Sequence, residues 1–385
     1  GSVGAAVVAM LKQHVDNALV AQAALDALCN HSLDAAACMT LIRDQGAGAA
    51  VVAAMQQHAD NVVVVRAACR SGCNLSRPSD ACVLLERDAS IYDAVVAALQ
   101  RHTSDVEVAT VACLALRNLA AVAFGRTLLA RDASACAAVM AALKQHGGNA
   151  NVIEAALRAL WNMTINTTTV CGWLLHPSGM LDVLPVITVA FQRHANNVTV
   201  ARAACNVLRN LGANAPNLLV VEQAVVDALV AALQLHGSVP ITAALGCWVL
   251  YRIACVEANR ALVASERSAE VVVGLLQRHM GDVVVVAAAC SAIWALVELR
   301  RVRIPLPRVE GASTGVLAAL QRHTHGDALT VDAITHTLCY AAKYHCARPM
   351  KLTSEHAAAL RHIMGAHPTH CGVQLCCDDA LTLLH

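Results

Sequence analysis

Leu99-Gln100-Arg101-His102 is one copy of a short phrase that recurs along the chain at a nearly constant interval. Successive copies lie 44, 44, 44, 48, 42, 43, 44 and 44 residues apart. A period of about 40 to 47 residues is typical of helical repeat arrays. The sequence therefore predicts an all-α solenoid of about nine stacked repeats that spans residues 1–385 as a single array. The histidines that close the copies are His14, His58, His102, His146, His194, His236, His279 and His323, with a looser copy at His367.

The composition agrees with closely packed helices. Apolar residues make up 57% of the chain, whereas aromatic residues make up only 3%. No run of about 18 uncharged apolar residues, which a membrane-spanning helix needs, is present. The best candidate, residues 218–233, is interrupted by Glu222 and Asp227. The net charge of +1 gives no electrostatic reason to expect nucleic acid as a partner, so neither a membrane nor a nucleic acid is predicted.

The cysteines follow the repeat. The chain has seventeen, and five of them lie 11 residues after a repeat histidine. Leu157 holds the equivalent position in another repeat, which indicates a small buried apolar site where a free cysteine fits. Free thiols predict a reducing intracellular compartment, most simply the cytoplasm, with the nucleus left open. The five cysteines are Cys69, Cys113, Cys205, Cys247 and Cys290.

Each repeat is predicted to hold three helices, as residues 121–163 illustrate. A short helix covers residues 121–129, a second covers 135–146 and a third covers 152–163, with apolar residues at helical spacing. The turn at residues 131–134 offers Asp132 or Ser134 as a cap for the second helix, and an Arg-Asp turn recurs at residues 43–44 and 87–88.

Several segments depart from the simple repeat. The valine runs at residues 62–65 and 283–286 favour strands by local propensity, but their place in the repeat predicts helix starts. Pro305 and Pro307 interrupt the first helix of the eighth repeat. The terminal repeats, residues 1–30 and 341–385, are degenerate, as is typical of repeats that cap an array.

The segments predicted as third helices have the most distinctive sequence pattern of the repeat. Residues 108–119 and 200–211 end in Leu-Arg-Asn-Leu, and residues 152–163 end in Leu-Trp-Asn-Met. With three helices per repeat, this text resembles the armadillo repeat family, the α-solenoids of the β-catenin and importin-α type. The resemblance implies a right-handed superhelix in which the third helices line a concave groove.

The resemblance also implies a peptide-binding role for an asparagine near the end of each third helix. An asparagine side chain offers both a donor and an acceptor, so a ladder of them can bond the backbone of an extended segment. The ladder is interrupted in the later repeats by Arg252 and Ala295, and then by Cys339 or Tyr340. The matching residues are Asn30, Asn74, Asn118, Asn162 and Asn210.

Arginines surround this ladder at positions four and eight residues earlier, on the same helical face. They outnumber the acids Asp26 and Glu154 there, and Trp248 lies four residues before Arg252. Arginine pairs with carboxylate or phosphate, so an acidic or phosphorylated extended segment is the predicted ligand. The paired Trp and Asn of the importin type are absent, which argues against a basic nuclear signal. The arginines are Arg66, Arg70, Arg158 and Arg202, together with Arg252 at the ladder position itself.

Other functions find less support. No nucleophile elbow, phosphate loop, dinucleotide fingerprint or metalloprotease helix occurs, so the chain is predicted to be no enzyme and to need no cofactor. The segment from His367 to Asp379 matches no zinc spacing, and the repeat histidines suit helix C-termini, so no metal is predicted. A structural role within a larger assembly, through the array ends or the convex face, stays open. An uncovered end could also pair with a second copy.

Overall fold

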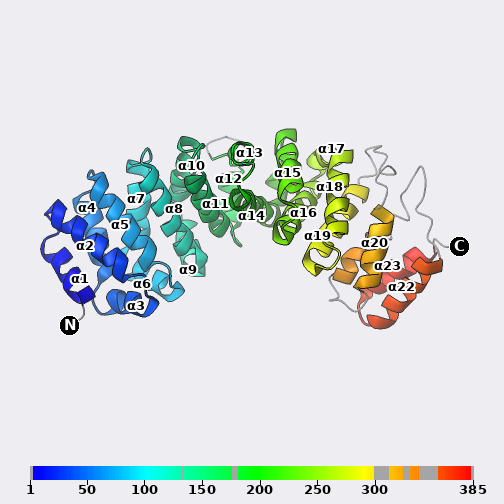
Figure 1. Ribbon diagram of the computed structural model, residues 1–385, viewed down its shortest axis with the longest axis horizontal. Helices are drawn as coiled ribbons and strands as arrows, with labels where there is room; N and C mark the ends of the chain where they lie inside the picture. Colours follow the sequence, from blue (N-terminus) through cyan, green and yellow to red (C-terminus); the bar gives the residue numbers. More distant parts are fainter. Residues whose placement is uncertain are drawn as a thin grey trace. The chain divides into compact units, whose positions relative to one another are not determined.

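A computed structural model describes residues 3–131, 133–175, 181–298, 312–323, 330–335, 337 and 354–382. All regular structure in these ranges is helical, mainly α-helix with two short 3₁₀ turns (Figure 1). The predicted all-α class is confirmed. Pro305, Pro307, Cys339 and Tyr340, on which two sequence interpretations rested, lie outside the described residues.

The three-helix repeat is present as predicted. α9 (Ala123–Leu129), α10 (Ser134–Gln145) and α11 (Ala150–Met163) form the repeat used above as the example. The first repeat contains only a second and a third helix, α1 (Val3–Gln13) and α2 (Ala18–His31). The two repeats between them are complete and contain α3 (Ala35–Arg43), α4 (Ala47–Gln57) and α5 (Val62–Leu75), then α6 (Ser79–Ala89), α7 (Ile91–Arg101) and α8 (Val106–Ala121).

The later repeats vary mainly in the first helix. It is α12 (Thr168–Leu174) in one repeat, the 3₁₀ turn η1 (Pro216–Leu218) in the next, and η2 (Glu257–Asn259) with α17 (Arg260–Val263) in a third. The valine runs at residues 62–65 and 283–286 begin helices, as predicted. The remaining helices are α13 (Leu184–Arg193), α14 (Val198–Asn214), α15 (Gln223–His236), α16 (Pro240–Ala254), α18 (Glu266–Arg278), α19 (Val283–Glu298), α20 (Ala312–Arg322), α22 (Ser354–Ala366) and α23 (Cys371–Thr382).

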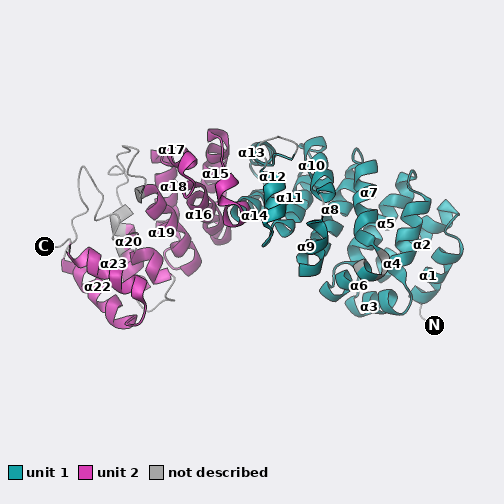
Figure 2. Cartoon of the chain, turned by 180° about the vertical axis from the view of Figure 1, so that it is seen from behind, with its two compact units in different colours: residues 1–210 teal, residues 211–385 magenta. Residues whose placement is uncertain are grey.

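The helices form two compact units, residues 1–210 (unit 1) and 211–385 (unit 2) (Figure 2). In unit 1 the third helices α2, α5, α8 and α11 pack against one another in chain order. In unit 2 the third helices α16 and α19 pack side by side (Figure 1). Each unit therefore presents a surface built from consecutive third helices, which we call its third-helix face.

Six third helices begin at an asparagine or aspartate three residues after the repeat histidine, whereas α16 begins behind Val239 with no side-chain cap. The side-chain oxygen accepts hydrogen bonds of 2.9–3.4 Å from two backbone N–H groups of the first helical turn. These bonds satisfy donors that a helix otherwise leaves unpaired at its start. The capping residues are Asn17, Asn61, Asp105, Asn149, Asn197 and Asp282.

The turn predicted at Arg43 and Asp44 lies at the end of α3, but two other turns before second helices differ from the sequence expectation. α10 begins at Ser134 behind Ala133 and has no side-chain cap bond, and Asp132 lies outside the described residues. α6 continues through Arg87 to Ala89, so the predicted turn there is wrong. The chain instead turns at Ser90, whose φ of 48° lies in the left-handed region. Gly46, 44 residues earlier, has the same conformation with a φ of 63°, which a glycine adopts without steric cost.

The repeat cysteines lie in the core, as predicted. All five, and the equivalent Leu157, are at most 1% exposed. Burial raises the pKa of Cys69, Cys113, Cys205 and Cys290 to about 12. No single helix among the described residues has the length and apolar character to cross a bilayer, although two sharply bent helix pairs meet that test by length and composition alone.

Candidate functional site

The predicted asparagine ladder joins consecutive third helices within unit 1. The Nδ2 atom of each later asparagine donates to the backbone oxygen of the residue just before the equivalent asparagine in the preceding repeat. The four bonds are Asn74 to Cys29 (3.0 Å), Asn118 to Cys73 (3.0 Å), Asn162 to Arg117 (2.8 Å) and Asn210 to Trp161 (3.0 Å). These four hydrogen bonds link consecutive repeats and so help to fix the register of one repeat on the next.

The asparagines differ in how far their side chains are exposed and therefore accessible to a ligand. Asn118 and Asn210 are only 9% and 7% exposed, and Asn118 Oδ1 accepts from the Arg117 guanidinium at 2.9 and 3.2 Å. Asn74 and Asn162 are half-buried, and Asn30, with no preceding repeat in the described chain, is exposed. Contact with a peptide backbone stays a prediction, and it fits Asn30, Asn74 and Asn162 best.

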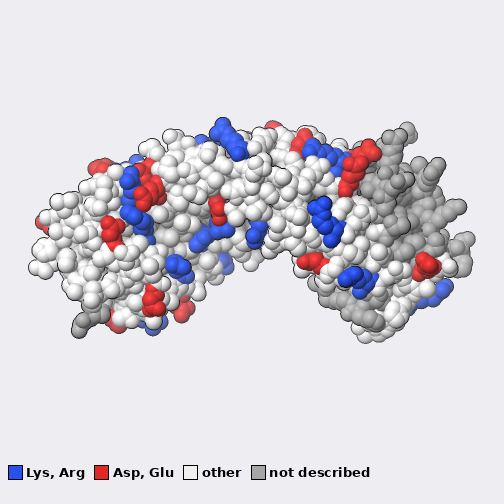
Figure 3. Space-filling model, viewed as in Figure 1, with Lys and Arg blue, Asp and Glu red and all other residues white. Residues whose placement is uncertain are grey.

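Two of the predicted arginines form a network with acids of neighbouring repeats. Arg66 donates to both carboxylate oxygens of Asp105, at 3.2 and 2.5 Å, and Arg70 lies 3.4 Å from Glu107 and 3.6 Å from Asp26. The hydrogen bond from Arg66 lowers the pKa of Asp105 below its usual range against the opposing effect of burial. These charges are therefore largely neutralised within the protein. In the view of Figure 3, some basic side chains adjoin acidic ones and others stand apart, and they form no continuous basic patch.

Arg158 is also paired. Its Nη2 atom lies 2.9 Å from Glu154, one helical turn earlier on α11, and Glu154 accepts a second bond from Thr199 Oγ1 at 2.6 Å. The carboxylate is thus shared between two partners. Arg158 keeps part of its hydrogen-bonding capacity for a further acceptor.

Arg117 is a candidate that the sequence analysis missed. It directly precedes Asn118 on α8, and among the described residues no carboxylate lies within ion-pair distance of its guanidinium. Burial is the main cause that lowers the pKa of Arg117, and the positive charges of Arg158 and Arg77 lower it further, while Cys73 and Glu154 oppose them. We call Arg77, Arg117 and Arg158 the arginine cluster. An anion bound there would offset charge that the protein itself leaves unbalanced.

Arg202 also keeps capacity for a ligand. Its Nε atom is buried and finds no hydrogen-bond partner among the described residues, while its backbone oxygen accepts from Asn206 at 3.0 Å. A buried N–H without an acceptor is costly, so the Arg202 side chain would gain from moving to meet an acceptor brought by a ligand.

In unit 2 the predicted residues Trp248 and Arg252 meet two aromatic residues that the sequence analysis did not single out. The ring centroids of Trp248 and Tyr251 lie 5.8 Å apart, as do those of Tyr251 and Trp294. The Arg252 guanidinium carbon lies 5.5 Å from the Tyr251 centroid. We call Trp248, Tyr251 and Trp294 the aromatic cluster.

The repeat histidines have a structural role. In six of the nine, the Nε2 atom bonds the backbone oxygen of the residue that directly follows the equivalent histidine in the preceding repeat. The distances are 2.6 Å for His58 to Val15, 2.7 Å for His102 to Ala59, 2.6 Å for His146 to Thr103, 3.0 Å for His194 to Gly147, 2.6 Å for His279 to Gly237 and 2.8 Å for His323 to Met280. No group of three or more metal-ligating side chains occurs in the described ranges.

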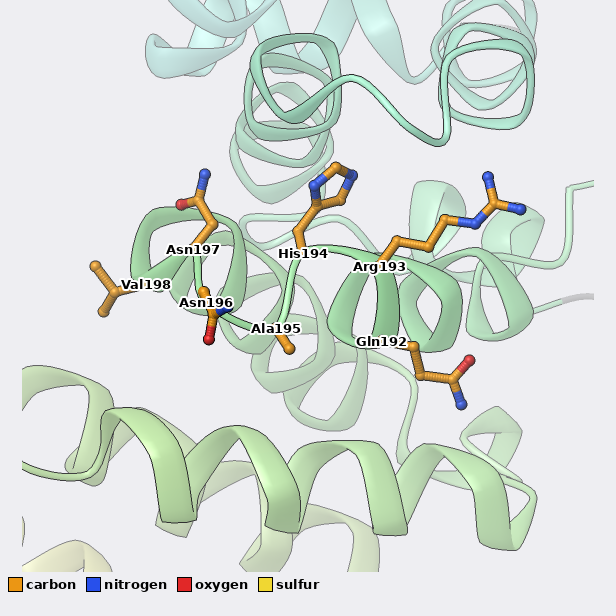
Figure 4. A pocket seen from close by; sticks show the side chains of 7 residues that line it. All are labelled: Gln192, Arg193, His194, Ala195, Asn196, Asn197 and Val198. Carbon is orange, nitrogen blue, oxygen red and sulfur yellow. The ribbon is translucent and has the colours of Figure 1, made fainter.

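A shallow surface pocket of about 570 Å³ lies at the turn between α13 and α14, and residues 192–198 line it. Figure 4 shows His194 and Asn197 pointing to one side of this turn and Gln192 to the other. His194 bonds Gly147, and Asn197 caps α14. Because these two side chains already make hydrogen bonds within the protein, we do not consider the pocket a candidate binding site.

Comparison with known proteins agrees with the geometry. A family model described as LRRK2 ARM repeat matches residues 83–245. The chain is similar to a solved structure described as "A conserved phosphorylation switch controls the interaction between cadherin and beta-catenin in vitro and in vivo", with 15% identity, 98% of this chain and 77% of that chain covered, and a TM-score of 0.76.

An engineered protein, a Northeast Structural Genomics Consortium target, is similar over 100% of this chain and 99% of its own, with 18% identity and a TM-score of 0.59. No curated protein matches in sequence. At these identities the solved structures establish the fold, and the family model agrees with the third-helix text. The chain therefore has the fold of an armadillo-type α-solenoid, and residues 83–245 are similar to armadillo repeats in sequence.

Proposed function

We propose that the chain is a non-catalytic scaffold that binds an extended protein segment along the third-helix face of unit 1. In this proposal the arginine cluster and Arg202 bind acidic or phosphorylated side chains of the segment, and Asn30, Asn74 and Asn162 contribute backbone contacts. The observation that carries it is Arg117, a half-buried guanidinium that has like charges beside it and, among the described residues, no carboxylate within ion-pair distance. Arg66 and Arg70 are left out because both pair with acids of neighbouring repeats. Arg158 is kept because its partner Glu154 also accepts a hydrogen bond from Thr199.

The similarity to the structure that concerns cadherin and β-catenin supports the proposal. The interaction between those two proteins is controlled by a phosphorylation switch. Phosphorylation adds negative charge and acceptor oxygens that arginine binds well. We further propose an intracellular location, in the cytoplasm, because the buried free thiols suit a reducing compartment.

Arg117→Glu tests the proposal by fluorescence anisotropy with three labelled peptides of equal length: one rich in aspartate and glutamate, a phosphoserine version and a lysine-rich version. The wild type is expected to bind the first two and to bind the lysine-rich peptide at least tenfold more weakly. Arg117→Glu is expected to lose at least tenfold in affinity for both anionic peptides. Circular dichroism must first show that the variant is folded.

Arg101→Glu is the matched control, because Arg101 makes an exposed pair with Asp60 at the end of the second helix α7. Its affinity for the peptides should equal that of the wild type. Equal binding by Arg117→Glu and the wild type, or equal binding of basic and acidic peptides, would contradict the proposal.

A second candidate function is contact with a partner through the end of unit 1. Val3 and Met10 on α1 are 68% and 46% exposed, whereas Ala47 and Ala54, their equivalents in the next repeat, are fully buried. The end face therefore exposes apolar side chains at positions that interior repeats cover. Val3→Asp combined with Met10→Asp should abolish any self-association seen by sedimentation, and a monomeric wild type would argue against a second copy as the partner.

A further inference from the structure

The aromatic cluster concentrates an unusual share of the chain's aromatic residues. The whole sequence contains four tryptophans, four tyrosines and two phenylalanines. Two of the tryptophans and one of the tyrosines touch one another on α16 and α19, the neighbouring third helices of unit 2 (Figures 1 and 2). In a protein whose core is built from alanine, valine and leucine, large rings are not needed to fill space, so their gathering calls for another reason.

The cluster lies on the third-helix face. Tyr251 directly precedes Arg252, which holds the ladder position of its repeat, and Trp248 lies one helical turn before it. Trp294 holds in the next repeat the position that Tyr251 holds in its own. All three residues are partly exposed to solvent, although the indole nitrogen of Trp294 is buried. Adjacent rings that keep exposed area are typical of anchor points in protein interfaces, where tryptophan and tyrosine supply much of the binding energy.

Arg252 sets the charge of the surroundings. Its guanidinium lies 5.5 Å from the Tyr251 ring centroid, and among the described residues no carboxylate lies within ion-pair distance of it. A positive charge already beside the ring disfavours a cationic ligand there through like-charge repulsion. The same charge favours an acidic group next to whatever occupies the rings. The site therefore suits an apolar side chain with an acidic neighbour.

We propose that the aromatic cluster is an anchor site for one large apolar side chain of a bound protein segment, and that Arg252 pairs with an acidic residue beside that anchor. The proposal rests on the proposed function in one respect, the binding of an extended segment to a third-helix face. It adds a second site, in unit 2, with its own residues and its own ligand chemistry.

The test uses a positional peptide library in which acidic residues flank one central position that holds each amino acid in turn. Binding is measured by anisotropy for the wild-type chain. Central phenylalanine, tryptophan, leucine and methionine are expected to bind at least tenfold more tightly than central serine, and central lysine and arginine more weakly than serine. No preference at the central position, or a preference for a cationic residue, would overturn the proposal.

Substitutions in the protein test whether the aromatic cluster causes the preference for an apolar central residue. Trp248→Ala is expected to reduce the advantage of an apolar centre at least fivefold, and Trp248→Phe is expected to restore most of it. Arg252→Gln is expected to weaken peptides with acidic flanks and leave those with asparagine flanks unchanged. Trp173→Ala, which removes a partly exposed tryptophan outside the cluster, is the control and should change nothing. An equal loss in Trp173→Ala and Trp248→Ala would refute the site.

The same peptides separate this proposal from the proposed function. The library member with a central serine tests acidic binding alone, and Arg117→Glu should weaken it. If that peptide binds through Arg117 and an apolar centre adds nothing, the anchor site is wrong and the proposed function stands. If an apolar centre strengthens binding through Trp248 while Arg117→Glu has no effect, the anchor site stands and the acidic site in unit 1 is wrong.

Discussion

The imidazole Nε2 of His102 lies 2.7 Å from the backbone oxygen of Ala59, the residue that directly follows the equivalent histidine of the preceding repeat. His102 is also the C-cap residue of α7, and its own backbone N–H bonds Ala98. One residue thus ends a helix and ties it to the turn before. The sequence interpretation placed these histidines at helix C-termini, which is confirmed, but the side chains bond the neighbouring repeat and not their own helix.

His102→Ala should destabilise the protein by about 1–2 kcal/mol, because the Ala59 carbonyl loses its donor in a part-buried turn. Urea denaturation measures the change in the free energy of unfolding. His14→Ala is the matched control, since His14 belongs to the first repeat and is exposed. A loss for His14→Ala as large as that for His102→Ala would show that the bond between repeats is not the cause.

Asn118→Ala should likewise cost about 1–3 kcal/mol, because it removes the donor to Cys73 and the acceptor that holds Arg117. Asn30→Ala should change stability little, since Asn30 is exposed. Thermal unfolding of the two variants gives the comparison. Equal melting temperatures would argue that the ladder contributes nothing to the stack.

Asp105→Ala should destabilise unit 1 by about 1–2 kcal/mol at pH 7, since Asp105 both caps α8 and pairs with Arg66. The pKa of Asp105 is lowered in the folded protein, so its stabilising effect is present above the unfolded pKa and is lost as the pH falls through the folded one. The difference between wild type and variant should therefore shrink below about pH 4. Urea titrations at neutral and at acidic pH measure it. A constant difference would contradict a contribution from the ionised carboxylate.

Gly125→Ala should destabilise the protein even though alanine favours helices. A Cβ at Gly125, on α9, would overlap the backbone oxygen of Leu119, which cannot move aside as a side chain can. Gly172→Ala on α12, the corresponding short helix of the next repeat, meets no atom within 4 Å and should stabilise by about 0.5–1 kcal/mol. Differential scanning calorimetry should show shifts of opposite sign. Shifts of the same sign would disprove the steric argument.

Thiol labelling of the native protein at mildly alkaline pH should reach Cys255 and Cys371 first, because both are exposed. Cys69, Cys113, Cys205 and Cys290 should react only after unfolding, since they are buried and a pKa of about 12 leaves almost no thiolate. Mass spectrometry of peptides after timed labelling gives the order. Early labelling of Cys113 would contradict the buried position.

The helices could be predicted because a similar sequence recurs about every 44 residues. A segment whose secondary structure is ambiguous in one repeat is clearly helical in another. The valine run at residues 62–65 is an example. The caps at Asn61 and Asp105 were not predicted, although their position three residues after each histidine recurs with the repeat.

The charge state of the candidate groove could not be predicted from the sequence. Arg66 and Asp105 are 39 residues apart, and only the offset between neighbouring third helices decides that they meet. Arg117 was not predicted because it lies directly beside the asparagine, and not four or eight residues before it on the same helical face. Tyr251 and Trp294 also lie directly before the ladder positions of their repeats. Inspection of that position in every repeat would therefore have pointed to the aromatic cluster as well.

The histidine and asparagine ladders share a direction. In both, a side chain of the later repeat bonds a backbone oxygen of the earlier one. A ribosome releases the chain from its N-terminus, so each emerging repeat brings its donors to acceptors that have already been synthesised. No repeat has to wait for a later one to fix its register on the one before. The protein can therefore grow as a folded stack while it is still being translated.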